Sequence, residues 1–189
     1  ALPSVLDDVA RFASLDDALA AVDADAWIIA SSTSTHVPFA KRILETGKAV
    51  LVEKPLASTL DEAETLGSLI REDSSNLLLG HSYVYGSEFL ALEAEVKQRG
   101  KPAYIDCVRH RPRALRPRFP DESPFHMLMV HDLCLTLALM DRDEPTSFSA
   151  QVRRTPDGKH DVALAQLGWP DGRLASFTAS LITPEGMPG

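Results

Sequence analysis

Residues 26–55 read AWIIASSTSTHVPFAKRILETGKAVLVEKP, and this stretch decides the fold. Two short apolar runs, 27–30 and 49–52, have the length and composition of buried strands. Between them, apolar residues recur at helical spacing over residues 37–46, and Gly47 is placed to end that helix. A strand, a helix and a second strand within about 30 residues form a βαβ unit. The sequence therefore predicts two parallel strands joined by a right-handed crossover.

Polar clusters follow both predicted strands. The second strand runs into Glu53-Lys54-Pro55, and the first is followed by small hydroxyl residues and a histidine: Ser31, Ser32, Thr33, Ser34, Thr35 and His36. Ligands of open parallel sheets bind beyond the carboxyl ends of the strands. Lys54 can donate a hydrogen bond to a ligand there, and the hydroxyl residues can bind ribose or phosphate. The alternatives are a surface lysine at a strand end and hydroxyl residues that cap the helix.

Composition and charge argue against several classes of function. The chain has 189 residues, with 27 acidic and 19 basic residues and a net charge of −8, which disfavours nonspecific nucleic-acid binding. No apolar run is long enough to cross a bilayer. Cys107 and Cys134 lie in apolar segments without a CxxC motif, so neither a disulfide framework nor a metal site is implied. We therefore expect a cytoplasmic protein with no nucleic-acid or membrane partner.

The pattern of secondary structure changes near residue 82. Residues 1–82 alternate between helical and strand patterns, which predicts a doubly wound parallel sheet. Residues 83–189 contain a nearly all-round apolar helix over 125–140, which is expected to be deeply buried. Strand-like runs with Pro-Asp-Gly turns then predict an antiparallel or mixed sheet: residues 147–153, 162–168 and 174–181. The predicted fold class is α/β, a partial Rossmann-type parallel sheet followed by an α+β domain.

His131 and a basic segment are the candidate functional groups of the second half. His131 lies among apolar residues, where an imidazole suits a general base; the alternative is a core histidine bonded to a backbone carbonyl. Asp132 is about 100° further round the predicted helix, so the two are not expected to form a dyad. Residues 109–124 hold several prolines and charges and are predicted to be a loop. Its arginines, including Arg109 and Arg111, suit a phosphate or carboxylate, with a solvated loop as the alternative.

Taken together, these residues resemble the Gfo/Idh/MocA oxidoreductases, the family of glucose–fructose oxidoreductase and inositol dehydrogenase. Residues 25–57, with the hydroxyl cluster and Glu53-Lys54-Pro55, are similar to the family's second nucleotide-domain segment. Residues 80–85, GHSYVY, resemble the strand that crosses between its domains, and residues 128–133 resemble its active-site helix. The likeness covers residues 10–182.

The resemblance implies hydride transfer between NAD or NADP and a secondary hydroxyl of a sugar, sugar derivative or cyclitol. It makes residues 1–82 a partial NAD(P)-binding domain and residues 83–189 a domain for substrate binding and self-association. Lys54 corresponds to the catalytic lysine that hydrogen-bonds the reacting oxygen, and His131 to the histidine that acts as acid or base. The residues expected at the cofactor are Ser31, Ser32, Thr33, His36, Glu53, Lys54 and Pro55. Those expected at the substrate are His81, Tyr83, Arg109, Arg111 and Asp132.

Two departures from the family pattern leave a second interpretation open. The chain has no GxGxxG turn to hold a pyrophosphate, so we expect it to lack the family's N-terminal segment and to bind the cofactor weakly. Met127 occupies the position, one helical turn before His131, where the family often has an aspartate. The C-terminus is also expected to be truncated. The alternative to an enzyme is thus a non-catalytic or truncated family member with a regulatory or structural role.

Self-association is a further expectation from the resemblance, because family members usually associate through the open face of the C-terminal sheet. A homodimer or homotetramer is predicted. The apolar strand positions expected to supply that face are Val162, Leu164, Leu167, Leu174, Phe177 and Leu181.

Overall fold

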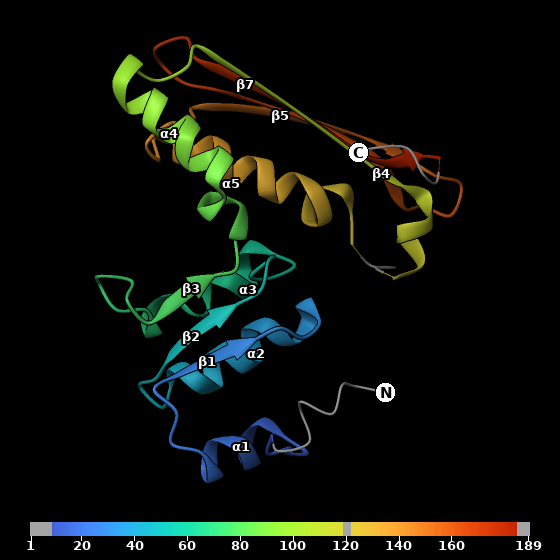
Figure 1. The fold of residues 1–189 in the computed structure, drawn as a ribbon. Coiled ribbons are helices and arrows are strands. Elements are labelled where there is room, and N and C mark those ends of the chain that lie inside the picture. The colour runs from blue at the N-terminus through green and yellow to red at the C-terminus, as the bar shows by residue number, and fades with distance from the viewer. Residues whose placement is uncertain (1–8, 119–121, 185–189) are drawn as a thin grey trace. The chain divides into compact units, whose positions relative to one another are not determined.

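The computed structural model describes residues 9–118 and 122–184, which form two compact units divided in the sequence between Gly80 and His81 (Figure 1). Each unit has its own sheet and its own hydrophobic core. Within these described ranges, no helix combines the length and apolar character that crossing a bilayer requires.

The first unit is built on a three-stranded parallel sheet in the order β1-β2-β3, which confirms the parallel pairing predicted from the βαβ pattern. Its elements in chain order are α1 (Leu15–Ala21), β1 (Ala26–Ile29), α2 (Thr33–Leu44), β2 (Ala49–Val52), α3 (Leu60–Glu64), the 3-10 turn η2 (Gly67–Leu69) and β3 (Leu77–Leu79). Ser14 caps α1, and its hydroxyl accepts a hydrogen bond from the backbone N–H of Asp17. The helix α2 begins at Thr33 rather than at Val37, because the hydroxyl residues form its first turn.

The core of the first unit lies on one face of its sheet. Side chains of α1, α2 and η2 pack there against alternate strand residues such as Ile29, whereas Ile28 is 74% exposed and Leu78 is 50% exposed. Successive strand residues point to opposite faces, so these two side chains belong to the other face. The buried core residues are Ile29, Ala40, Ile43, Leu44, Val50, Val52 and Leu66.

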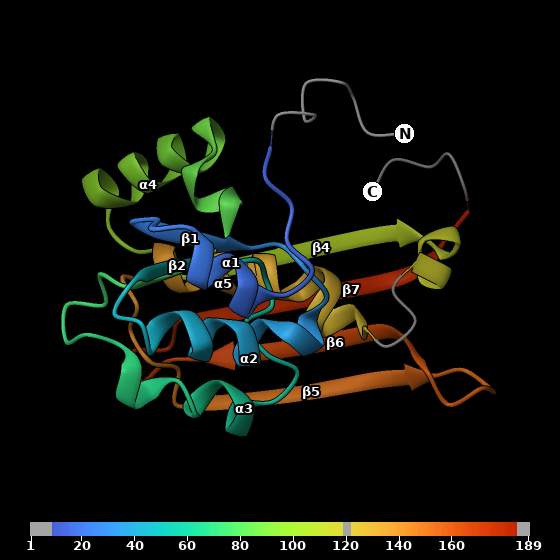
Figure 2. The same ribbon diagram turned by 90° about the horizontal axis from the view of Figure 1, so that it is seen from below.

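The second unit is a four-stranded mixed sheet in the order β4-β7-β6-β5 (Figure 2). Its elements are the 3-10 turns η3 (Ser82–Tyr85) and η4 (Arg113–Arg118), the helix α4 (Ser87–Arg99), the π-helical turn η5 (Phe125–Met129), the helix α5 (Val130–Leu139) and the strands β4 (Tyr104–Pro112), β5 (Ser147–Arg154), β6 (His160–Gly168) and β7 (Leu174–Thr183). The strands β5, β6 and β7 form an antiparallel meander, whereas β4 pairs with β7 in parallel. Of the two arrangements predicted for this domain, the mixed sheet is therefore the one observed.

Strand alternation sorts the apolar residues of β6 and β7 onto two faces. Phe177 and Leu181 are 1% and 0% exposed and pack in the core with residues of η5, whereas Leu164 and Leu174 are 41% and 54% exposed on the opposite face. Residues an odd number of positions apart on one strand point to opposite faces, which separates Leu174 from Phe177. The expectation that Phe177 and Leu181 supply an open face is therefore wrong.

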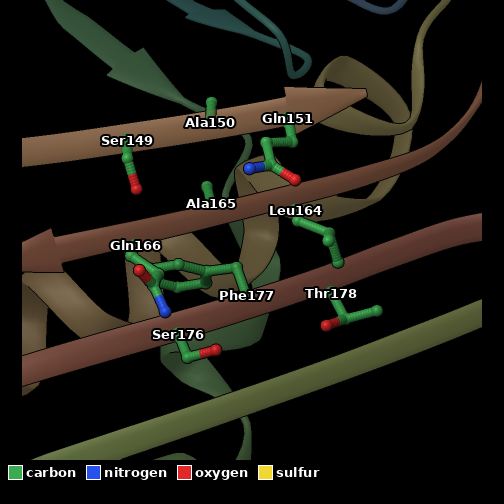
Figure 3. Close-up of a pocket in the computed structure, with 9 residues that line it drawn as sticks. All are labelled: Ser149, Ala150, Gln151, Leu164, Ala165, Gln166, Ser176, Phe177 and Thr178. Atoms are coloured by element: carbon green, nitrogen blue, oxygen red, sulfur yellow. The ribbon is translucent and has the colours of Figure 1, made fainter. Parts of the chain in front are cut away.

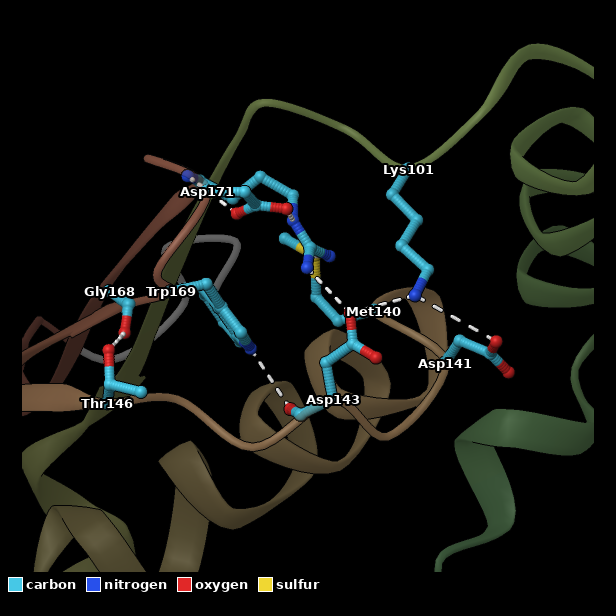
Figure 4. Close-up of polar contacts among 9 residues, drawn as sticks. Lys101, Met140, Asp141, Asp143, Thr146, Gly168, Trp169 and Asp171 are labelled. Atoms are coloured by element: carbon cyan, nitrogen blue, oxygen red, sulfur yellow. Dashed lines mark hydrogen bonds and ion pairs between the residues drawn. The ribbon is translucent and has the colours of Figure 1, made fainter.

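A network of charged side chains and an indole ties the end of α5 to the turn between β6 and β7 (Figure 4). Asp143 accepts hydrogen bonds from Lys101 Nζ at 2.8 Å and from Arg173 Nη2 at 2.6 Å. Trp169 Nε1 donates to the backbone carbonyl of Asp143 at 3.0 Å, and the Arg173 guanidinium lies 5.7 Å from the Trp169 ring centroid. This network holds one end of the second sheet against the helix that packs on it.

Replacing Asp143 with asparagine is expected to destabilise the second unit near neutral pH but much less in acid. The hydrogen bonds from Lys101 and then from Arg173 lower the pKa of Asp143 below its usual value. A carboxylate with a lowered pKa stabilises the fold above its unfolded pKa, and that stabilisation is lost as the pH falls through the folded value. The loss of unfolding free energy caused by Asp143→Asn should therefore become smaller below about pH 4.

Urea unfolding followed by Trp169 fluorescence, in a Trp27→Phe background, measures this deficit at each pH. Asp141→Asn is the matched control, because the Asp141 carboxylate lies 3.8 Å from Lys101 Nζ and its side chain is 87% exposed. A deficit of Asp143→Asn that stays constant from neutral to acid pH contradicts the prediction.

Candidate functional site

Backbone pairing brings the two polar clusters of the first unit to the same edge of its sheet. The backbone N–H of Glu53 donates to the carbonyl of Ile29 at 2.9 Å, and that of Gly80 donates to the carbonyl of Val52 at 2.7 Å. The segments that leave β1, β2 and β3 therefore run side by side beyond the last paired strand residues. The hydroxyl cluster and Glu53-Lys54-Pro55 are neighbours at this edge.

The hydroxyl cluster forms the N-terminal end of α2. Ser31 and Ser32 are exposed; Ser31 Oγ lies 2.5 Å from Thr35 Oγ1, and Ser32 Oγ lies 3.4 Å from Ser34 Oγ. Thr33, half-buried, is the first helical residue. Ser32 is the N-cap residue, but its side chain makes no cap hydrogen bond. A helix N-terminus without a side-chain cap leaves backbone N–H groups and a partial positive charge for a polar or anionic ligand.

His36 connects the hydroxyl cluster to the segment after β2. Its side chain is 1% exposed, with Nδ1 at 2.7 Å from the carbonyl oxygen of Pro55 and Nε2 at 3.1 Å from that of Ser31. Both ring nitrogens therefore face backbone carbonyls inside the protein. This histidine, which the sequence places among the cofactor contacts, is buried in the structure and holds the two halves of the site together.

Replacing His36 with alanine is expected to destabilise the first unit. The change leaves the carbonyls of Pro55 and Ser31 without the imidazole, and a buried group that loses its hydrogen-bond partner costs about 1–3 kcal/mol. Urea unfolding followed by Trp27 fluorescence, in a Trp169→Phe background, measures the loss. His36→Gln retains one donor group and should recover part of the stability. An unfolding free energy for His36→Ala equal to that of the parent protein contradicts this role.

Glu53, Lys54 and Pro55 form the second part of the edge. Glu53 is exposed, and its Oε2 accepts a hydrogen bond from the backbone N–H of Lys54 at 3.2 Å. Lys54 is half-buried and precedes a buried Pro55 through a cis peptide bond. A Cβ atom on Gly80 would lie 3.2 Å from Glu53 Cα and 3.3 Å from Glu53 Oε1. The absence of a side chain at Gly80 therefore allows β3 to end close beside Glu53.

Arg109 and Asp132 form a buried ion pair in the second unit. Arg109 Nη2 donates to Asp132 Oδ1 at 2.6 Å, and Arg109 Nε donates to Oδ2 at 3.1 Å. Asp132 is 6% exposed. These hydrogen bonds to the carboxylate raise the pKa of Arg109, so the guanidinium stays charged. Both residues were expected to contact the substrate. In the structure they are paired with each other.

The prediction that residues 109–124 form a loop is wrong for their first part, because β4 continues to Pro112 and η4 follows it. Alternation along β4 directs Ile105 and Cys107 toward the core, and Arg109 continues that face. An inward-facing arginine requires an acidic partner, and Asp132 lies on the apolar helix that covers this face. The sequence therefore contained the signal for this pair: an arginine in phase with the inward-facing residues of the strand, and an aspartate within the apolar helix.

His131 packs against an aromatic ring rather than against Asp132. The rings of Tyr83 and His131 have centroids 4.7 Å apart and planes at 86°. The guanidinium of Arg109 lies 5.2 Å from the centroid of the Tyr83 ring. Asp132 accepts hydrogen bonds from Arg109. The structure thus brings together four of the residues that the sequence suggested separately.

The remaining candidates of the second unit lie on η3 and β4. His81 is half-buried and precedes the first residue of η3. Arg111 is half-buried, and its Nη1 donates to the carbonyl of His110 at 3.3 Å. Among the described residues, no group of three or more His, Cys, Asp or Glu side chains could hold a metal ion.

The chain is similar to members of a known protein family. Residues 5–81 match the GFO_IDH_MocA family model, described as an oxidoreductase family with an NAD-binding Rossmann fold. The UDP-N-acetylglucosamine 3-dehydrogenase of Acidithiobacillus ferrooxidans is 33% identical over 175 residues, which are 92% of this chain and 53% of that protein. The chain belongs to the Gfo/Idh/MocA family of oxidoreductases. This Gfo/Idh/MocA chain spans about half the length of the relatives that it matches.

Solved structures share the fold of this Gfo/Idh/MocA chain. That of the Acidithiobacillus enzyme superposes with a TM-score of 0.78 at 32% identity and covers 92% of this chain and 55% of the enzyme. The myo-inositol 2-dehydrogenase of Lactobacillus plantarum gives 0.80 at 20% identity, over 93% of this chain and 56% of that one. GenD2 from gentamicin A biosynthesis, solved in complex with NAD, gives 0.75 at 22% identity, over 93% and 53%. The predicted fold class is therefore confirmed.

Proposed function

We propose that this Gfo/Idh/MocA chain serves an NAD(P)-dependent oxidoreductase that acts on a secondary hydroxyl of a sugar, sugar derivative or cyclitol. The observation that carries the proposal is Lys54 at the carboxyl edge of a parallel sheet, beside the uncapped N-terminus of α2. Two relatives are named as dehydrogenases of UDP-N-acetylglucosamine and of myo-inositol, a sugar nucleotide and a cyclitol.

The residues at this edge fit the polar parts of a dinucleotide. The exposed hydroxyls and the N-terminal end of α2 suit phosphate and ribose oxygens, and the exposed Glu53 carboxylate suits ribose hydroxyls. Cofactor contact is thus assigned to Ser31, Ser32, Thr33, Glu53 and Lys54. Pro55 and His36, both buried, are assigned to holding these residues in place. When bound, the nicotinamide would exchange a hydride with the carbon that carries the substrate hydroxyl.

The chain supplies a proton acceptor and an electrostatic stabiliser for such a reaction. His131 takes the hydroxyl proton as general base. The role assigned to Lys54 is to donate a hydrogen bond to a substrate oxygen and to stabilise the negative charge that develops there. His81, Tyr83 and Arg111 orient the substrate, whereas Arg109 and Asp132 neutralise each other.

A non-catalytic family member is the second candidate function. It is favoured by Met127, which occupies the position one turn before His131 and is buried in the core of the second unit. A thioether there cannot exchange a proton with the imidazole. A chain that neither binds NAD(H) or NADP(H) nor turns over any sugar or cyclitol would support a structural or regulatory role.

Replacing His131 with asparagine is expected to lower the rate of NAD(P)H formation by about 10²–10⁴, the usual contribution of a general base. Lys54→Met should also lower the rate. Myo-inositol and UDP-N-acetylglucosamine are the first substrates to assay, with cofactor affinity measured separately by calorimetric titration. The affinity should not change in His131→Asn, because the base acts on the substrate.

Lys48→Met is the matched control, because Lys48 belongs to the same unit and pairs with Asp23 at 2.7 Å instead of lying in the site. A rate for His131→Asn within about threefold of the parent would place the base elsewhere, because loss of a general base costs far more.

We also propose that the chain forms a homodimer or homotetramer through the open face of its second sheet. Exposed apolar side chains on this face include Tyr104 and Val108 from β4, Leu164 from β6 and Leu174 from β7. A groove is lined by residues of β5, β6 and β7, Leu164 among them; Figure 3 also shows Gln151, Gln166, Ser176 and Thr178 in its lining. An exposed apolar patch rimmed by polar side chains is typical of a protein–protein interface.

Replacing Leu164 with arginine should shift the chain toward the monomer, because a charge in an apolar interface is costly to desolvate. Light scattering at matched concentrations measures the shift. Leu60→Arg is the control, because Leu60 is 72% exposed on α3 of the first unit, which contributes no strand to the second sheet. A parent chain that is already monomeric contradicts this proposal.

A cytoplasmic location completes the proposal. Cys107 and Cys134 are both free thiols, and burial raises the pKa of each of them, which keeps them protonated. Free thiols without a disulfide are typical of proteins that work in a reducing compartment.

A further inference from the structure

Four side chains of the second unit form a closed cycle of contacts that begins and ends on consecutive residues of α5. The ring of His131 meets the ring of Tyr83, with centroids 4.7 Å apart. The guanidinium of Arg109 lies over the Tyr83 ring at 5.2 Å and donates two hydrogen bonds to Asp132. Asp132 follows His131 in the chain, so the cycle links α5, η3 and β4.

The ion pair is the most constrained part of this cycle. Asp132 is 6% exposed, and the Arg109 side chain is 19% exposed. Two hydrogen bonds to one carboxylate, at 2.6 and 3.1 Å, hold the guanidinium plane in a single orientation. Separating a buried pair leaves an uncompensated charge in the protein interior, which is strongly unfavourable. The guanidinium is therefore a fixed surface for whatever packs on it.

Tyr83 is the least constrained part. Its side chain is 44% exposed, and it belongs to the 3-10 turn η3, which has only 4 residues. An exposed side chain on a short turn exchanges between rotamers on a fast timescale unless its neighbours restrict it. The Arg109 guanidinium and the His131 ring are neighbours that restrict it, through cation–π and edge-on aromatic contacts.

We propose that Arg109 and Asp132 are positioning residues: they hold the Tyr83 ring against His131 and so fix the orientation of the imidazole. A general base needs a fixed ring orientation, because proton transfer requires a nitrogen aimed at the hydroxyl. This consequence for catalysis rests on the proposed function, whereas the geometry of the four side chains does not. The competing explanation is that the ion pair only joins β4 to α5, with no effect on the imidazole.

The test is the contact between the Tyr83 and His131 rings, measured by NMR on the chain as it exists. Signals of His131 are assigned by their loss in His131→Gln, and those of Tyr83 by their loss in Tyr83→Leu. The parent protein should show nuclear Overhauser cross-peaks between the two rings. It should also show His131 ring protons displaced by the tyrosine ring current, and Tyr83→Phe should preserve that displacement.

The decisive variant is Arg109→Met with Asp132→Leu, which removes both charges together. Replacing a buried ion pair by apolar residues is often neutral for stability, so this variant should remain folded. We expect it to lose the cross-peaks and to move the His131 signals toward those of Tyr83→Leu. Arg99→Met with Glu95→Leu is the matched control, because it removes a 2.6 Å arginine–glutamate pair from the surface of α4.

Arg109→Lys provides a second, independent variant should the double replacement unfold. Lysine keeps a positive charge beside Asp132 but has no planar guanidinium to stack on the tyrosine ring. We expect the cross-peaks to weaken while the chain stays folded. Cross-peaks and His131 shifts equal to those of the parent in a folded variant would overturn the proposal, as would their absence from the parent. Because this readout needs no turnover, it stands apart from a failure of the dehydrogenase function.

Discussion

The parallel pairing of β2 with strands on both sides is the constraint on which the first unit depends. Since β2 lies between β1 and β3, the segments that leave all three strands must emerge at one edge. The polar residues after β1 and β2 therefore meet without any side chain having to bring them together. His36 then fixes their spacing through two backbone carbonyls, and Gly80 allows the third segment to approach. Backbone topology positions the site, and side chains refine it.

The second unit is organised by a different kind of constraint, the burial of charge. An arginine on the inner face of β4 is compatible with the core only because Asp132 lies opposite it on α5. A second arginine, Arg153, pairs with the fully buried Asp161 at 2.6 Å and ties the edge strand to its neighbour. The core of the unit is otherwise apolar. Its buried residues include Met129, Phe177 and Leu181. Charged side chains thus join neighbouring elements here, while apolar burial supplies most of the stability.

Local patterns were enough to predict some features and insufficient for others. The position of Glu53-Lys54-Pro55 at the edge of the sheet could be predicted from short apolar runs. The length and order of the strands that they form are encoded within 30 residues of sequence. The start of α2 was missed because serine and threonine are poor helix formers, so the apolar period begins only at Val37. The prediction placed Phe177 on the wrong face of the sheet. Because β7 has apolar residues on both faces, the sequence alone does not show which alternate residues face the core. The contact of His36 with the Pro55 carbonyl joins residues 19 positions apart, and no local rule reaches that far.

The parallel pairing of β4 with β7 also bears on how the second unit is made. Tyr104 pairs with Leu174, and the His110–Ser180 contact joins residues 70 positions apart. During synthesis from the N-terminus, β4 therefore leaves the ribosome long before its only hydrogen-bonding partner in the described sheet exists. The meander of β5, β6 and β7 is joined by short turns and can form by local steps. The backbone N–H and C=O groups of β4 that pair with β7 stay without this partner until β7 is synthesised. Within the described sheet, β7 is thus both the latest strand to be synthesised and the one that pairs with β4.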